Sequence, residues 1–338
     1  MDVFIRDVSA FLPNQPVGND DLEKVLGMVG DLPSRVRRVI LRSNKIESRH
    51  YAIDPADGSL THTNAQMTAA AIRRLRPHAD FHIGEIECLS CGTSTPDLLI
   101  PGHALMVQGE LGAAPLEAVT SHAICLSGMA AMKYAYMNVA LGLTKNAAAS
   151  GSDLASSFIR GAFYRTPDWN DETGKKCEPL PFDADFLRWT LSDGAGAVFL
   201  GPKPNPDGLS LRIDWIEIES HAHALETCMY AGGEKLADGR VRGWRESASW
   251  DKGERNLMAI KQDVRLLNRE ITRVCVEVIL PRVIRKRPLA PGDVSWFLPH
   301  YSSEYFREEL AGKLKAVGFE IPPEKWFTNL TRKGNTGA

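Results

Sequence analysis

The chain has 338 residues, of which 43% are hydrophobic and 24% are charged, so it can bury a large core as one domain or two closely packed halves. Its 40 basic and 42 acidic residues give a formal net charge of -2, which excludes a general attraction to nucleic acid or to an anionic membrane. Since no run approaches the roughly 18 apolar residues of a membrane span, and the charged N-terminus lacks a signal-peptide core, we expect a cytoplasmic protein.

Strand-like and helix-like runs alternate along the chain. The strand-like runs are 81–90, 116–125, 196–201 and 294–300, and the helix-like runs are 64–76, 126–143 and 262–280. This alternation predicts an α/β fold in which helices are layered on sheets. The last helix-like run has one apolar stripe, and we expect Pro281 to disturb or end that helix.

A turn-rich segment, PKPNPDG (202–208), follows a complete strand signal and predicts a boundary between 1–205 and 206–338. A weak internal repeat supports this division, because 83–94 can be laid over 291–302 at an offset of 208 residues (291 minus 83). If the repeat is real, the chain is a duplicated α/β unit.

A cysteine stands where a strand-like run meets a helix-like run. The run 126–141, LSGMAAMKYAYMNVAL, is apolar nearly all round, which indicates a buried helix. Cys125 would then lie at or just before its first turn, where free N–H groups and the helix dipole favour an anion and lower the thiol pKa toward neutrality. The same N–H groups would hold an oxyanion on a bound carbonyl. The alternative is that Cys125 is a small buried core residue.

Two further polar residues are candidate partners of this thiol. His300 follows the apolar strand signal VSWFLPH, so it would be held at a strand end; the alternative is an ordinary loop histidine. Asn335 lies between Gly334 and Gly337, which let the backbone approach closely, although GNTG is also a common turn sequence. The pair CLSC (88–91) has the spacing of half a metal knuckle, but no second pair completes it, so we expect no metal site.

The chain resembles the β-ketoacyl-acyl-carrier-protein synthase III family of the thiolase fold. The resemblance covers most of the chain, and the order and spacing of its motifs are specific although each motif alone is weak. The matching segments are FLPNQPVGNDDLE (11–23), NKIESRHYA (44–52), GTSTPDLLIPGHALMVQGELG (92–112), the region of Cys125, GSD (151–153), LSDGAGAVFL (191–200), PGDVSWFLPH (291–300) and GNTGA (334–338). The resemblance implies two duplicated α/β halves in a layered helix-sheet-helix-sheet-helix architecture, with the cysteine in 1–205 and the histidine and asparagine in 206–338.

The resemblance also implies a reaction and its site residues. Cys125 matches the nucleophile that takes an acyl group from an acyl-coenzyme A or acyl-carrier-protein thioester. His300 and Asn335 match the pair that binds the carbonyl of a malonyl-type donor and stabilises the enolate left by decarboxylation, which then attacks the acyl-cysteine. No metal and no organic redox cofactor is implied, and the implied partners are an acyl carrier protein and a second copy of the chain in a homodimer.

Some positions depart from the family pattern. Family members commonly follow the histidine with Gln-Ala-Asn, whereas this chain has Tyr301, Ser302 and Ser303. This departure favours a specialised role in secondary metabolism over fatty acid initiation, and we still expect Ser303 to contact substrate. The tryptophan that often stacks on coenzyme A has no counterpart. We expect the nearby arginines to bind phosphates or an acidic carrier protein, the alternative being a solvated helix face. These arginines are Arg35, Arg37 and Arg38.

Ile100 matches a position where the family often has an aromatic residue that reaches across the dimer interface into the acyl pocket, so a smaller side chain suggests a longer or branched acyl group. The family continues past GNT through a helix and two strands, so we expect this chain to be a shortened form. Three other functions stay open: acyl transfer to an oxygen or nitrogen acceptor without decarboxylation, thioester or peptide hydrolysis by the cysteine, and an inactive partner subunit of a heterodimeric synthase.

Overall fold

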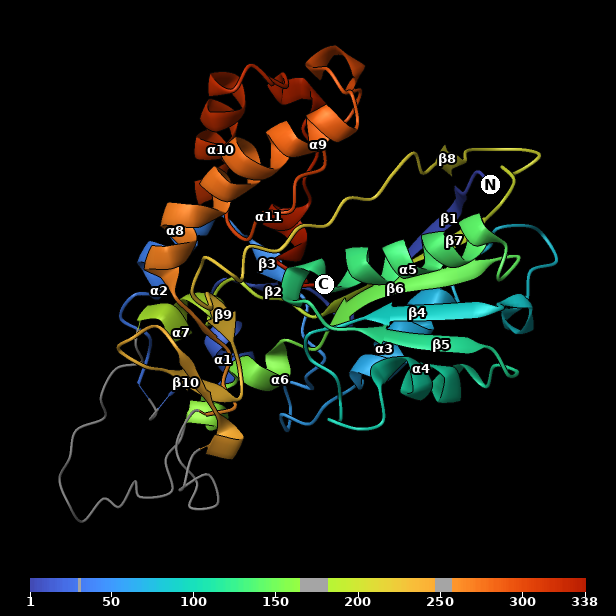
Figure 1. Cartoon of the computed structure of the whole chain (residues 1–338). Coiled ribbons are helices and arrows are strands. Elements are labelled where there is room, and N and C mark those ends of the chain that lie inside the picture. Colours follow the sequence, from blue (N-terminus) through green and yellow to red (C-terminus); the bar gives the residue numbers. More distant parts are fainter. Residues whose placement is uncertain (30–31, 165–181, 247–256) are drawn as a thin grey trace.

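The computed structural model describes residues 1–29, 32–164, 182–246 and 257–338, and its main feature is a six-stranded sheet of order β5-β4-β6-β7-β1-β8 (Figure 1). These strands are β1 (Phe4–Phe11), β4 (Cys88–Gly92), β5 (Glu117–Ser121), β6 (Ala147–Asp153), β7 (Gly194–Gly201) and β8 (Leu211–Arg212). β4 runs parallel to β5 and β6, whereas β7 is antiparallel to β6 and β1. The predicted α/β fold class is therefore confirmed.

Helices cover both faces of this sheet. α3 (Asn64–Ile72) and α4 (His103–Leu111) pack on one face, and α5 (Ser127–Leu141) packs on the other (Figure 1). A capping box between Thr63 and Gln66 begins α3 and satisfies two of its free N–H groups. This arrangement is the helix-sheet-helix part of the predicted layering.

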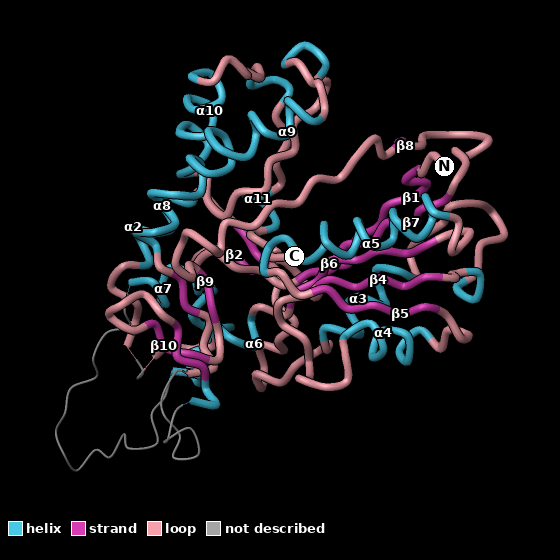
Figure 2. The backbone as a smooth tube through the Cα atoms, in the orientation of Figure 1, coloured by secondary structure: helices cyan, strands magenta, loops and turns pink. Residues whose placement is uncertain are grey.

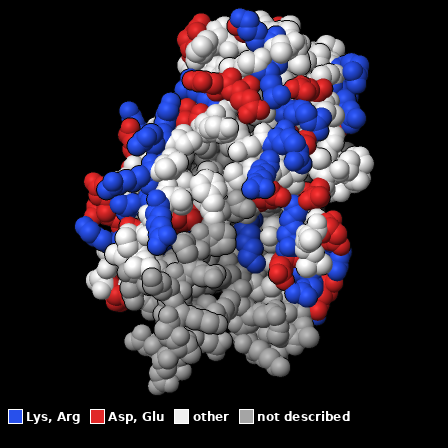
Figure 3. All heavy atoms as spheres, turned by 90° about the vertical axis from the view of Figure 1, so that its left-hand side faces the viewer, with Lys and Arg blue, Asp and Glu red and all other residues white. Residues whose placement is uncertain are grey.

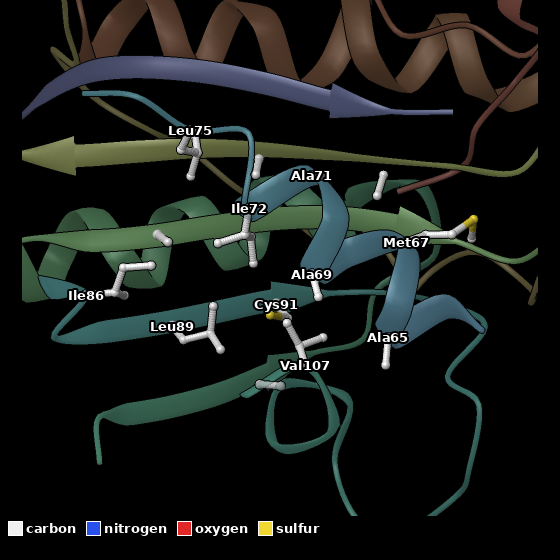
Figure 4. Close-up of a cluster of buried hydrophobic side chains, with 14 of the residues drawn as sticks. Ala65, Met67, Ala69, Ala71, Ile72, Leu75, Ile86, Leu89, Cys91 and Val107 are labelled. Carbon is white, nitrogen blue, oxygen red and sulfur yellow. The ribbon is translucent and has the colours of Figure 1, made fainter. Parts of the chain in front are cut away.

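The largest hydrophobic cluster lies between α3, α4 and the sheet (Figure 4). Small side chains on α3, including Ala65, Ala69 and Ala71, allow that helix to approach the strands closely, and Ile72, like Leu89 of β4, is fully buried. Close packing of this kind makes the removal of a large side chain costly. The carboxyl ends of β4 and β6 are therefore fixed on a rigid framework.

The C-terminal part of the chain is mainly helical (Figure 2). Its helices are α8 (Val264–Arg273), a π-helical segment (Val274–Ile279), α9 (Leu280–Lys286), α10 (Tyr305–Ala316) and α11 (Leu330–Lys333). Pro281 disturbs the helix, as one of the two predicted outcomes, but does not end it: a π-helical segment precedes it and the chain continues through α9. Proline lacks an N–H and its ring crowds the preceding turn, and the wider π-helical turn before Pro281 accommodates both effects.

The strand-like run 294–300 lies in an extended loop that makes a single parallel bridge, between Phe297 and Trp326. Among the described residues of 206–338 beyond β8, strands occur only as two-stranded pairs, β9 (Met229–Tyr230) with β12 (Lys261–Gln262) and β10 (Gly233–Lys235) with β11 (Val241–Gly243). The division into two duplicated halves stays a prediction.

The remaining elements are short. They are α1 (Leu22–Leu26), α2 (Arg37–Asn44), α6 (Ser156–Ile159), α7 (Phe182–Arg188), and the pair β2 (Val17–Gly18) and β3 (Ser48–Arg49). In the part of the chain that the structure describes, no helix combines the length and the apolar character that crossing a membrane requires.

Candidate functional site

Cys125 lies in the turn that joins β5 to α5, as the sequence predicts. A short 3-10 turn, Ile124–Leu126, precedes α5 directly, and Ile124 has a φ of 51°, a left-handed conformation that a β-branched residue rarely adopts. Ser127 holds this turn, because its Oγ accepts the N–H of Ala123 at 2.8 Å and donates to the carbonyl of Ile124 at 2.7 Å. The sulfur is thus placed at the N-terminal end of a helix by a constrained turn.

The protonation state of this thiol differs from the prediction. Burial raises the pKa of Cys125 to about 12, and the nearby carboxylate of Asp153 adds to the rise. The prediction that the thiol pKa falls toward neutrality is therefore wrong for the protein without substrate, because desolvation of the thiolate outweighs the favourable helix terminus. At pH 7 the side chain is a neutral thiol, which loses its proton only in the course of a reaction.

His300 and Asn335 line the same cavity as Cys125, although the three residues are far apart in sequence. The cavity has a volume of about 290 Å³ and most of its wall is hydrocarbon. Apolar side chains from three helices contribute to that wall, among them Leu187, Leu267, Ile271, Phe306 and Leu310. Cys125 and His300 also line a second cavity, of about 560 Å³, on the side of residues 336–338.

Asn335 is held by its backbone against the segment that precedes β7. Its N–H donates to the carbonyl of Thr190 at 3.1 Å, and its carbonyl accepts the N–H of Ser192 at 2.8 Å. The side-chain oxygen accepts the N–H of Gly337 at 3.1 Å, while the side-chain Nδ2 has no hydrogen-bond partner among the described residues. The amide is therefore oriented so that its N–H donors stay available for a ligand.

The imidazole of His300 follows Pro299 at the end of the loop that carries Phe297. His300 as a residue is exposed, yet the protein around its imidazole lowers the pKa of His300, because the charged imidazolium loses part of its solvation there. The ring is accordingly neutral at pH 7 and carries one N–H, which gives the cavity a second uncharged hydrogen-bond donor beside the amide of Asn335. Uncharged donors of this kind stabilise an oxyanion without transferring a proton to it.

The other candidate residues do not line this cavity. Ser303 is buried and its Oγ accepts the N–H of Tyr305 at 3.2 Å at the start of α10, whereas the neighbouring Ser302 lines the cavity. Ile100 is 84% exposed and precedes a cis peptide bond to Pro101. It lies in an exposed apolar loop, where contact with another chain would be needed to cover it.

The three predicted arginines have different surroundings. Arg37 forms an ion pair of 2.8 Å with the largely buried Glu23, so it has a partner within the chain. Arg35 and Arg38 are exposed. The face of the molecule that carries α2 and α8 shows basic and acidic side chains interspersed around a largely uncharged hollow, rather than a patch of one sign (Figure 3). A role in phosphate binding therefore stays a prediction.

Several residues near the thiol were not singled out from the sequence. Asp153 at the end of β6 is 4% exposed and lies close enough to Cys125 to influence its charge. Cys275, in the π-helical segment, lines the cavity with Cys125. For Asp153, the GSD motif was the available sequence signal. For Cys275 there was none, since a single cysteine on an amphipathic helix has no distinctive pattern. Cys88 and Cys91 lie in two different hydrophobic clusters, so they do not converge on a metal.

Comparison with known proteins identifies relatives along the whole chain. No protein-family model matches it. The chain is 26% identical over 334 residues to a protein named Beta-ketoacyl-[acyl-carrier-protein] synthase III from Bordetella petrii, covering 99% of this chain and 85% of the relative. It is 25% identical over 337 residues to a protein of the same name from Rhodospirillum centenum, covering 99% and 86%.

Solved structures share the fold. AbyA1, described as a tetronic acid condensing enzyme, superposes with a TM-score of 0.69 at 19% identity, covering 99% of this chain and 87% of that one. The synthase III structure from Pseudomonas aeruginosa PAO1 gives a TM-score of 0.69 at 18% identity, covering 99% and 86%. These identities are low, so the superpositions establish the fold, and the full-length sequence relatives establish the likeness to one family. The chain is thus similar along its whole length to proteins named β-ketoacyl-acyl-carrier-protein synthase III, and it shares the thiolase fold of the solved structures.

Proposed function

We propose that the protein condenses two acyl thioesters through an acyl-Cys125 intermediate, with His300 and Asn335 binding the second thioester. The observation that carries this proposal is that a thiol, a neutral imidazole and a free amide N–H, supplied by three distant segments, line one largely apolar cavity. This set combines a nucleophile with two uncharged donors, which is what attack on a thioester and stabilisation of an enolate require. The family likeness supports the same reaction class.

In the first half-reaction, the sulfur of Cys125 attacks the carbonyl carbon of an acyl-coenzyme A or acyl-carrier thioester. A new C–S bond forms, the old C–S bond breaks, and the thiol proton leaves with the departing coenzyme A or phosphopantetheine sulfur. Because the free thiol has a pKa of about 12, binding of the substrate and proton loss must be coupled. The N–H of Cys125 itself is our candidate to hold the developing oxyanion, because the N–H groups of Leu126 and Ser127 already donate to the carbonyls of Ala123 and Ile124.

In the second half-reaction, a malonyl-type thioester places its carbonyl oxygen between His300 and Asn335. Loss of CO₂ leaves an enolate whose negative oxygen accepts hydrogen bonds from the imidazole N–H and from Nδ2 of Asn335. The enolate carbon then attacks the carbonyl carbon of the acyl-cysteine. The new C–C bond forms, the C–S bond to Cys125 breaks, and the released thiolate takes up a proton from solvent. The lowered pKa of His300 keeps the ring neutral. A neutral imidazole donates a hydrogen bond to the enolate oxygen without protonating the enolate, so the enolate carbon stays nucleophilic.

The chain of the acyl group occupies the apolar cavity next to Cys125. Its volume of about 290 Å³ lies at the low end of the range for ligand sites, which suits an extended alkyl chain better than a bulky ring system. Each methylene buried there contributes about 0.8 kcal/mol, or about fourfold in affinity. Ile271 of α8 lines the wall, so Ile271→Trp should shorten the preferred acyl chain by several carbons.

Intact-mass measurement after incubation with a panel of acyl-coenzyme A thioesters tests the first half-reaction. The wild type should gain one acyl group, Cys125→Ala should gain none, and Cys275→Ala should still gain one. Cys275 is the matched control, because it is the other thiol of the same cavity. An adduct that persists in Cys125→Ala but disappears in Cys275→Ala would overturn the assignment of the nucleophile.

Release of CO₂ from malonyl-coenzyme A tests the second half-reaction. His300→Ala and Asn335→Ala should each accept an acyl group as the wild type does, but should release CO₂ at least a hundredfold more slowly. Acylation followed by rapid loss of the adduct to water would instead indicate a hydrolase. A product formed with an alcohol or amine acceptor and no CO₂ would indicate simple acyl transfer.

A further inference from the structure

The carboxylate of Asp153 joins three segments beside the nucleophile. Its Oδ1 accepts hydrogen bonds from the loop that follows β4: the N–H of Ser94 at 2.7 Å, the N–H and hydroxyl of Thr95 at 3.1 and 3.0 Å, and the hydroxyl of Thr93 at 3.1 Å. Its Oδ2 accepts the N–H of Ala338 at 2.8 Å. Five donors on one buried side chain favour the ionised carboxylate, which is an acceptor only, and so oppose the burial that raises the pKa of Asp153.

The Oδ2 side of this carboxylate acts on the segment that carries Asn335. Gly337 has a φ of 78°, and a Cβ at that position would lie 2.0 Å from Oδ2 of Asp153, so only glycine fits there. The N–H of Gly337 in turn donates to Oδ1 of Asn335. The orientation of the Asn335 amide therefore depends on a backbone that Asp153 fixes on one side.

The same segment lies beside the turn of the nucleophile. A Cβ on Gly128, in the first turn of α5, would lie 3.3 Å from the carbonyl carbon of Ala338, and a Cβ on Gly151 would lie 3.0 Å from the same atom. Ala338 thus packs closely against α5 and β6, and in Figure 1 the end of the chain lies at the start of α5. A shift of this segment would move Asn335 relative to Cys125.

We propose that Asp153 is a positioning residue, which orients the amide of Asn335 toward the cavity through Ala338 and Gly337 and places a negative charge beside the sulfur of Cys125. It touches neither substrate in the proposed reaction. Its geometric role can be measured without any assumption about that reaction, whereas its effect on CO₂ release rests on the proposed function.

The charge is tested by the rate of alkylation of Cys125 with iodoacetamide at pH 8, followed by intact mass. Asp153→Asn keeps the shape of the side chain but removes the charge, so the thiolate becomes less unfavourable and alkylation should be about three- to tenfold faster. Gly337→Ala leaves the charge in place, so its alkylation rate should stay within about twofold of the wild type. Asp193→Asn is the matched control, because Asp193 is equally buried but bonds to Ala52 and Ser156.

The orientation is tested by the side-chain amide resonance of Asn335 in protein labelled with ¹⁵N-asparagine, assigned by its loss in Asn335→Asp. Asp153→Asn replaces one of the two acceptor oxygens by an NH₂ group, and Gly337→Ala forces the backbone away from Oδ2 of Asp153. Both variants should therefore shift or broaden the Asn335 resonance. Asp193→Asn should leave it unchanged. With malonyl-coenzyme A as the probe, the first two variants should release CO₂ about tenfold or more slowly while still accepting an acyl group.

The outcomes separate the two proposals. An unshifted Asn335 resonance in both Asp153→Asn and Gly337→Ala would overturn the positioning role, and an unchanged alkylation rate in folded Asp153→Asn would overturn the electrostatic one. If Asp153→Asn does not fold, the resonance in Gly337→Ala alone decides the positioning role. Loss of CO₂ release in the wild type itself would count against the proposed reaction but not against the role of Asp153, since alkylation and the resonance do not depend on it.

Discussion

The two polar partners of Cys125 are held by regions of very different construction. Cys125 and Asn335 are tied to the six-stranded sheet, the first through the β5–α5 turn and the second through backbone bonds to Thr190 and Ser192. His300 lies at the end of a loop in which Trp296 and Leu298 are 64% and 66% exposed. The comparison indicates that the sheet region fixes the nucleophile and the amide, while a small, separately packed cluster places the imidazole.

Truncation of a core aromatic residue in each region gives the largest expected effect. Phe199 of β7 is 2% exposed and packs edge-on against Phe81 with ring centroids 5.2 Å apart, so Phe199→Ala should lower the free energy of unfolding by about 3–5 kcal/mol. Phe319→Ala, in the cluster beside α10, should mainly speed amide exchange in 264–338 and leave the sheet protected. Thermal unfolding and hydrogen exchange measure both. Equal loss of protection in the two regions would show that they unfold as one unit.

The pH dependence of thiol alkylation tests how strongly the sheet region buries Cys125. With a thiol pKa of about 12, the thiolate fraction rises tenfold per pH unit, so the iodoacetamide rate should rise in the same way from pH 7 to pH 10. Cys275 should be replaced by Ala in the measured protein, so that only one cavity thiol reports. A plateau reached near pH 8 would show that the helix terminus outweighs desolvation after all.

The imidazole can be displaced without disturbing the sheet region. Trp326 packs edge-on against Phe297 with centroids 4.9 Å apart and donates from its indole N–H to the carbonyl of Ile321 at 2.8 Å. Trp326→Leu should loosen the loop that ends at His300 and slow CO₂ release from malonyl-coenzyme A about tenfold. Alkylation of Cys125 should change less than twofold, because no described residue of the β5–α5 turn is a member of this cluster. A matching change in alkylation would show that the regions are coupled.

Local features of the sheet region were predictable from the sequence, whereas features that depend on distant contacts were not. The alternation of runs correctly indicated an α/β sheet and a cysteine at a strand-to-helix junction, because both are local patterns. The sulfur's pKa could not be predicted, since it depends on desolvation and on Asp153, which is distant in sequence. A disturbance at Pro281 was predicted, although not its π-helical form. The loop at 294–300 escaped prediction, because the apolar pattern alone does not distinguish a strand from an extended loop.

The smallest expected effects concern the arginines near α2, where structural and binding roles can be separated. Arg37→Ala breaks the ion pair with Glu23, a carboxylate only 9% exposed, so it should lower the free energy of unfolding by about 1 kcal/mol. Arg38→Ala removes an exposed side chain and should change it by less than about 0.5 kcal/mol. If the exposed arginines bind phosphates, Arg38→Ala should instead raise the KM for acyl-coenzyme A severalfold at low salt, with kcat unchanged. An unchanged KM in Arg38→Ala and in Arg35→Ala would show that these arginines are a solvated surface. Binding of the coenzyme would then not depend on the arginines near α2, and the contribution of the sheet region would be the thiol and the amide.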